Sequence, residues 1–175
     1  MSKKKHVLRG MVAGIAGGLV ASWVMNEFMA GPGKKLTEAV ESDADKQRVQ
    51  EQSSGEEPDA TMKTADLVVS TATGGQHLSW EEQEKAGPVV HYTFGALMGG
   101  LYGALAECWP GARAGFGTTF GSALFAGADL IAVPVLKLGP AADELPIAAE
   151  ASPLAAHMVY GATTELVRRV ARAIL

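Results

Sequence analysis

Four ionisable side chains lie inside otherwise apolar segments of the chain, one in each segment. They are two carboxylates and two imidazoles: Glu27, His91, Asp129 and His157. Carboxylate oxygens and imidazole nitrogens can ligate a divalent metal ion, and an imidazole can exchange a proton near neutral pH. The same groups can also pair with one another only to satisfy buried polar atoms. These residue types therefore leave structural pairing, proton or ion handling, and metal binding open as alternatives.

A second polar set lies near the ends of two of these segments. Glu165 precedes Arg168 and Arg169 by three and four residues, the spacing of ion pairs along one face of a helix. Glu107 lies six residues before Arg113, within reach across a short turn. We therefore expect Glu107, Glu165 and Arg169 to form ion pairs with a structural role.

The usual enzyme signatures are missing from the sequence. It holds no Ser-His-Asp order, no glycine-rich phosphate loop and no HExxH pattern. Its single cysteine, Cys108, excludes an intrachain disulfide and a metal site built on cysteines. A net charge of −4 argues against nucleic acid as a partner. The sequence thus predicts no catalytic residue and no cofactor, favours a protein that is not an enzyme, and leaves any metal unassigned.

The elements that would position these residues are four apolar segments of helical length. About 20 residues at 1.5 Å per residue are needed to cross ~30 Å of hydrocarbon. A soluble four-helix bundle would need a polar face on each helix, and residues 95–106 have none. We expect an all-α integral membrane protein, a single domain over 1–175, with four transmembrane helices at about residues 7–29, 88–109, 113–136 and 152–173.

Glycines recur four residues apart along the expected spans, as in the GxxxG pattern. Small residues at this spacing let two membrane helices approach closely. The positions expected to serve helix packing are Gly14, Gly18, Gly95, Gly99, Gly103, Gly117, Gly121 and Gly161. Their primary role is therefore expected to be structural.

The chain also carries signs of an internal duplication. The stretch from His91 to Gly95 resembles that from His157 to Gly161. Gly14 and Gly18 correspond in the same way to Gly117 and Gly121. The pattern predicts two tandem helical hairpins, with the two histidines at equivalent places.

Charge divides the chain and orients it. Residues 31–86 hold twelve acidic and six basic side chains, which predicts an extramembrane insert, helical in part and disordered in part. Within it, residues 59–73 have helical spacing, and Ser79 with Glu82 forms a capping box. All other basic residues except Lys137 gather at both termini and at Arg113, so the positive-inside rule places these in the cytoplasm and the turn 137–151 on the opposite side. All four ionisable residues of the first set then fall in the outer half of the membrane, where we expect them to share a polar cavity.

A further set of residues carries a family resemblance over roughly residues 90–170. It consists of His91, Ala106, Glu107, Pro110, Gly117, Gly121, Pro134, Leu145, Pro146, Glu150, His157, Glu165, Arg168 and Arg169. This half of the chain resembles the YagU-like family of bacterial inner-membrane proteins, whose function is not established. The resemblance implies a location in the bacterial inner membrane, which would make the insert periplasmic, and it brings no catalytic residues.

Three functions follow as expectations. The first is a small structural or accessory protein of the inner membrane, acting through helix packing and its acidic insert. The second is an oligomeric transporter or channel that handles protons or ions through the intramembrane His/carboxylate cluster. The third is a metal-binding membrane protein. The partners expected are the lipid bilayer and either further copies of the chain or another membrane protein.

Overall fold

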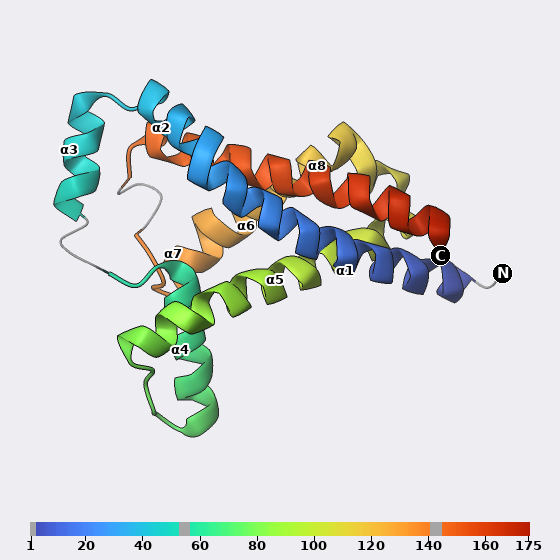
Figure 1. Ribbon diagram of the computed structural model, residues 1–175, viewed down its shortest axis with the longest axis horizontal. Coiled ribbons are helices and arrows are strands. Elements are labelled where there is room, and N and C mark those ends of the chain that lie inside the picture. Colours follow the sequence, from blue (N-terminus) through green and yellow to red (C-terminus); the bar gives the residue numbers. More distant parts are fainter. Residues whose placement is uncertain (1–2, 53–56, 141–144) are drawn as a thin grey trace.

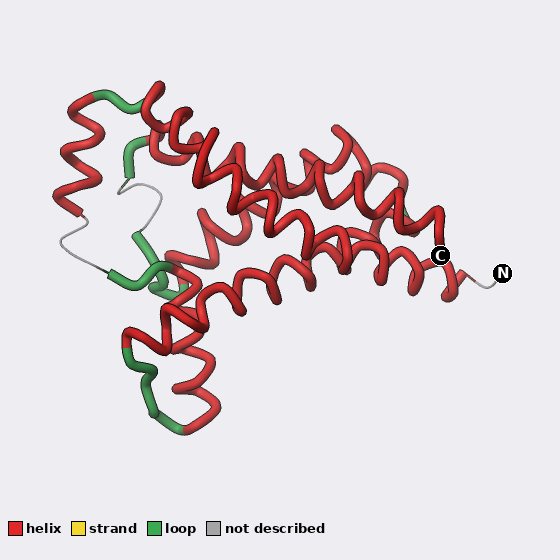
Figure 2. The backbone as a smooth tube through the Cα atoms, viewed as in Figure 1, coloured by secondary structure: helices red, strands yellow, loops and turns green. Residues whose placement is uncertain are grey.

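The computed structural model describes residues 3–52, 57–140 and 145–175, and these residues form helices joined by turns (Figures 1 and 2). The longest helices are α1 (Lys3–Phe28), α5 (Trp80–Cys108) and α8 (Ala151–Ile174). No strand occurs in the described part of the chain. The prediction of an all-helical protein is therefore confirmed.

Among the residues that the structure describes, three helical segments are long and apolar enough to cross a membrane. They are Lys4–Val40, Trp80–Cys108 and Pro110–Val135. Helix α8 has sufficient length but carries Glu165 and three arginines, which lower its mean hydropathy. Its charged residue Glu165 is nevertheless completely buried, on the face that packs against the other helices.

The long helices pack in the order α5, α1, α8, α6, where α6 spans Thr118–Gly127. Helix α1 contacts both α5 and α8, α6 contacts α8, and α5 makes only a few contacts with α8. In Figure 1, α5 and α8 run antiparallel to α1, so the N- and C-termini meet at one end of the bundle. We refer to this as the terminal end, and to the other as the insert end.

The first helix runs further than the sequence indicates. A π-helical turn, Met29–Gly33, joins α1 to α2 (Lys34–Val40) and contains Pro32. Because proline lacks an N–H, the wider turn lets the helical path continue where an α-helix would break. Residues 34–40, expected within the insert, therefore continue the helical path of α1.

The remaining insert forms two helices. They are α3 (Asp43–Gln52) and α4 (Ala60–Thr73), and α4 packs against the start of α5. Asp59 caps α4 by accepting from two backbone N–H groups, and Gly74 ends it at a φ of +76°. Ser79 and Glu82 form the expected capping box, so α5 begins at Trp80, eight residues before the predicted span. The helix and the cap predicted here are both confirmed.

The third predicted span is not one continuous helix. Its first residues form a 3-10 turn, Pro110–Gly117, in which Gly115 (φ +59°), Phe116 (φ +56°) and Gly117 (φ +88°) are left-handed. After α6, a π-helical turn, Ala128–Ala132, leads to the short α7 (Val133–Val135). A left-handed residue interrupts the i to i−4 hydrogen bonds, so the chain bends here before α6 begins.

The last helix is entered through a 3-10 turn, Ile147–Glu150. This turn and the π-helical turn after α6 both lie at the insert end of the bundle. Helix α6 is therefore flanked by irregular turns at both ends, whereas α8 itself is regular from Ala151 to Ile174.

Candidate functional site

Glycines bring the backbones of α1 and α5 into direct contact. A Cβ atom added at Gly14 would overlap the carbonyl oxygen of Gly99, and one added at Gly18 would overlap that of Gly95. Gly103 lies against Gly10 in the same way, one turn further along. The interior between these two helices is thus closed by main chain.

The same type of contact joins α6 to α8. An added Cβ at Gly117 would overlap the carbonyl oxygen of Gly161, and one at Gly121 would overlap that of His157. The sequence comparison matched Gly117 with Gly14. In the structure Gly117 contacts Gly161 as Gly18 contacts Gly95, so Gly117 corresponds to Gly18. The match between the two contacts is therefore shifted by four residues, about one helical turn.

A tyrosine ties α8 to α5 across this closed layer. The Tyr160 hydroxyl is buried and donates to the backbone carbonyl of Gly95 at 2.5 Å. That carbonyl also faces Gly18 of α1, so three helices meet at one peptide group. Gly17 of α1 lies against Thr164 of α8 nearby, which brings the α1–α8 interface equally close.

On the insert side of this layer, Asp129 and His157 form a pair. Asp129 lies on the π-helical turn Ala128–Ala132, and its Oδ2 is 3.6 Å from Nδ1 of His157. The same nitrogen is 3.0 Å from the carbonyl oxygen of Pro153. A carbonyl can only accept, so this hydrogen bond places a proton on Nδ1.

Glu150 adds a third ionisable group to this corner. It ends the 3-10 turn that precedes α8. Burial, and then the negative charge of Asp129, raise the pKa of the Glu150 carboxyl above its ordinary value. The insert end of the bundle thus holds two carboxyl groups that influence one another beside a buried imidazole.

The other two members of the first predicted set lie elsewhere. His91 is half-buried on α5, and its Nε2 is 3.4 Å from the backbone carbonyl oxygen of Ser22 on α1. Glu27 is exposed at the end of α1. The structure therefore brings together Asp129 and His157, and directs His91 to the α1 backbone.

Metal binding finds no geometric support in the residues that the structure describes. Within them, no group of three or more His, Cys, Asp or Glu side chains could hold a metal ion. The Asp129–His157 pair supplies two such groups at most, and a closed metal site needs three or four protein ligands.

At the terminal end, Glu165 is the centre of a buried charged cluster. It accepts hydrogen bonds from the Tyr102 hydroxyl at 2.9 Å, from Arg168 Nε at 2.7 Å and from Arg169 Nε at 2.6 Å. The two arginines are the partners that helical spacing predicts, and Arg168 is itself buried. Tyr102 comes from α5, so the cluster joins α5 to α8.

Glu107 extends this cluster to α1. Its Oε1 accepts from Arg172 Nε at 2.9 Å and lies 3.5 Å from Arg168 Nη1. Arg172 Nη2 in turn lies 3.0 Å from His6 Nδ1. The predicted pairing of Glu107 with Arg113 is wrong: Arg113 lies on the 3-10 turn Pro110–Gly117 and is exposed, whereas α8 brings Arg172 alongside.

Sequence reasoning missed three members of this cluster, namely His6, Tyr102 and Arg172. Their partners lie more than 60 residues away along the chain, so helical spacing cannot reveal them. The signal that could have found them is the position of the helix ends. Three antiparallel helices that begin or end at the same end of the bundle bring such residues close together. Every described carboxylate in the cluster is matched by arginine, which suits it to holding helices together.

Asp66 and His77 form an ionisable pair outside the apolar segments. Asp66 on α4 accepts from the backbone N–H of Leu78 at 2.6 Å and lies 2.8 Å from His77 Nδ1. The hydrogen bond with His77, and then that from Leu78, hold the pKa of the Asp66 carboxyl below its ordinary value. The pair fastens the loop between α4 and α5 to α4.

Comparison with known proteins assigns no chemistry to these groups. A family model described as "Protein of unknown function (DUF1440)" matches residues 45–166. No curated protein and no solved structure matches the chain. The matched residues begin in α3 and extend into α8, so they include Asp129, His157 and Glu165 and leave out α1.

Proposed function

Since this chain belongs to the DUF1440 family, whose description assigns no activity, we propose from its geometry that it is a small membrane protein of structural or accessory type. The observation that carries the proposal is the closed interior. Main-chain contacts at Gly14, Gly18, Gly117 and Gly121 occupy the places where a substrate path between the helices would run. The surfaces through which the protein would interact with partners are then the outer faces of the helices and the acidic insert.

The proposal includes four membrane spans, with α8 as the fourth. Helix α8 lies between α1 and α6, both of which belong to segments apolar enough to cross a membrane. Its charged side chains Glu165 and Arg168 are buried and paired with each other, so they need not face lipid. In this proposal, α1 with α5 forms the first of the two tandem hairpins, and α6 with α8 forms the second.

Exposed apolar side chains on the bundle support a lipid surrounding. Single exposed leucines are ordinary on a soluble protein, whereas extensive apolar patches mark a membrane or a partner. Exposed large apolar residues occur on α1, α5 and α8: Leu8, Met11, Val12, Ile15, Leu19, Val20, Trp23, Val89, Phe94, Leu97, Leu101, Leu105, Met158, Leu166 and Val170. These faces suit the hydrocarbon core of a bilayer.

For orientation, we propose the bacterial inner membrane with both termini in the cytoplasm and the insert in the periplasm. The support is the charge asymmetry: the terminal end holds the basic N-terminus, Arg113 and the last three arginines, and the insert is acidic. The YagU-like resemblance points to the same membrane.

A second candidate function is proton handling at Asp129 and His157. It is favoured by a specific observation, the placement of Asp129 on a π-helical turn beside a buried imidazole. Such turns are frequent at functional sites in helical proteins. Glu150 would relay protons between this pair and the periplasm.

A flux experiment separates the two. The purified chain is placed in vesicles with a pH-sensitive dye inside, and acidification is followed under an imposed potential. The accessory function predicts the rate of protein-free vesicles, and it predicts a stable complex with another membrane protein after mild solubilisation. A faster rate that His157→Gln abolishes and the matched His77→Gln retains would establish proton handling in its place.

A further inference from the structure

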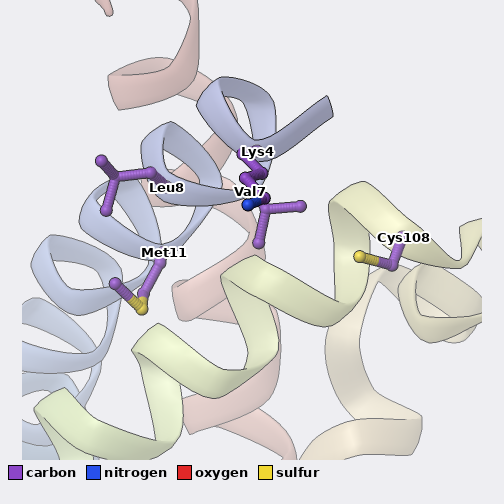
Figure 3. A pocket seen from close by; sticks show the side chains of 5 residues that line it. All are labelled: Lys4, Val7, Leu8, Met11 and Cys108. Atoms are coloured by element: carbon purple, nitrogen blue, oxygen red, sulfur yellow. The ribbon is translucent and has the colours of Figure 1, made fainter. Parts of the chain in front are cut away.

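An open groove follows the outer side of the α1–α5 pair. At the terminal end it forms a hollow of about 390 Å³ (Figure 3), lined by Lys4, Val7, Leu8, Met11 and Cys108. A second hollow of about 590 Å³ continues between the same helices and is lined by Ile15 and Leu19 from α1, among others. Between the two hollows the Ile15 side chain lies over Gly100, because a Cβ there would approach Ile15 Cγ1 to 2.9 Å.

The groove has one basic end and an apolar length. Lys4, Leu8, Met11, Ile15 and Leu19 follow one another at three- and four-residue steps, so they form one stripe along α1. Fifteen residues of helix span about 22 Å, which exceeds half of the ~30 Å hydrocarbon core. A charged head with a long apolar tail is the shape that this stripe complements.

We propose that this groove binds an anionic phospholipid of the cytoplasmic leaflet, with its phosphate at Lys4 and one acyl chain along Leu8, Met11 and Ile15. The inference rests on the proposed membrane location and orientation. Charge complementarity selects the anionic headgroup, since basic residues between helices on the cytoplasmic side attract such lipids. Without Lys4, the exposed apolar side chains of the stripe would contact bulk lipid and would not select one headgroup over another.

Cys108, the single cysteine, lines the groove and provides the probe. A small fluorophore on its thiol is compared in vesicles that contain either phosphatidylglycerol or phosphatidylcholine with a nitroxide on the acyl chain. Site occupancy should be about fivefold higher for the anionic lipid at equal mole fraction, the effect of one lysine near an anionic headgroup. Native mass spectrometry of the unlabelled protein should retain phosphatidylglycerol in preference to phosphatidylcholine.

Two variants make the test specific to the groove. Lys4→Gln should remove the preference, and Lys5→Gln, which removes the same charge about 100° further round the helix, should leave it. Both are exposed positions, so circular dichroism should show the same helix content in each.

Each other result overturns the proposal in a recognisable way. Equal quenching by both lipids, or equal loss in the two variants, means that the groove holds only bulk lipid. A dimer in which neither lipid quenches the probe means that a second copy covers the groove. If neither lipid quenches and the chain is also released by carbonate washing, the membrane location itself fails.

Discussion

Glu165 is a carboxylate with no exposed surface, held by two arginines and a phenol. Glu165→Gln would leave the buried Arg168 without its closest counter-charge. Removing one partner of a buried ion pair costs about 3 kcal/mol, and Arg168 then keeps the more distant Glu107, at 3.5 Å, as its counter-charge. We expect a correspondingly lower unfolding temperature in detergent, with little change for the exposed carboxylate variant Glu27→Gln. Equal stability of the two variants would show that the cluster does not hold the bundle together.

Asp66 makes the loop between α4 and α5 sensitive to pH. Its pKa is lowered in the folded chain by the hydrogen bonds with His77 and Leu78. A carboxyl group with a lowered pKa contributes stability above its unfolded pKa of about 3.9 and loses it as pH falls through the folded pKa. The loop between α4 and α5 should therefore be held at pH 5 to 7 and loosen below about 4. Hydrogen exchange of the Leu78 amide measures this, and Asp66→Asn should exchange rapidly throughout that range.

At the level of single residues, the sequence identified the unusual ones but only some of their partners. Glu165 with Arg168 and Arg169 could be paired in advance because helical spacing fixes who is adjacent. The partner of Glu107 depends on which helix lies beside α5, which spacing within one helix cannot show. His91 and His157 illustrate the same limit, since one contacts backbone and the other a carboxylate.

Among the elements, the α1–α5 contact makes the sharpest mutational prediction. A Cβ at Gly99 would overlap the Gly14 carbonyl oxygen and lie 2.7 Å from the Gly18 Cα, so Gly99→Leu must separate the two helices. Overpacking of this kind costs about 1–3 kcal/mol or more. Thermal unfolding in detergent should show a large loss for Gly99→Leu and almost none for Leu97→Ala, because Leu97 is 61% exposed.

Gly127 is the matched control for that experiment. Nothing lies within 4 Å of an added Cβ there, and the residue ends α6 with ordinary helical geometry. Gly127→Ala should therefore be neutral or stabilise by up to about 1 kcal/mol. If Gly99→Leu behaved like Gly127→Ala, the glycine rows would not be helix interfaces.

Helix caps were readable from the sequence and bends were not. Ser79 with Glu82 and the Gly74 stop act within four residues, so local chemistry determines them. The bend before α6 depends on Gly115, Phe116 and Gly117 all adopting positive φ. Phenylalanine has no preference for that conformation, so tertiary packing of this turn, which contacts α8 and α5, must hold it. The third segment was therefore expected as one helix.

For the whole molecule, the helical class and the apolar segments follow from composition, but the packing order does not. Apolar length indicates which segments can cross a membrane. A span was also expected at 152–173, but α8 is not among the segments apolar enough to cross a membrane, because it carries charge on its buried face, where partners are supplied. The most polar of the long helices is thus surrounded by more apolar ones, an arrangement visible only in three dimensions.

The topology of the whole chain can be tested by two reporter fusions. Both termini lie at the terminal end of the bundle, and the loop between α4 and α5, which contains Gly75, lies at the insert end (Figure 1). If α1, α5, α6 and α8 all cross the membrane, Gly75 and a site after Leu175 must report opposite sides, with Gly75 outside. The basic residues at the terminal end fix the sign, since they resist translocation. After Gly75 the chain crosses the membrane three times if α8 is a span and twice if it is not. A report of the same side at both sites would therefore exclude the fourth span and leave three.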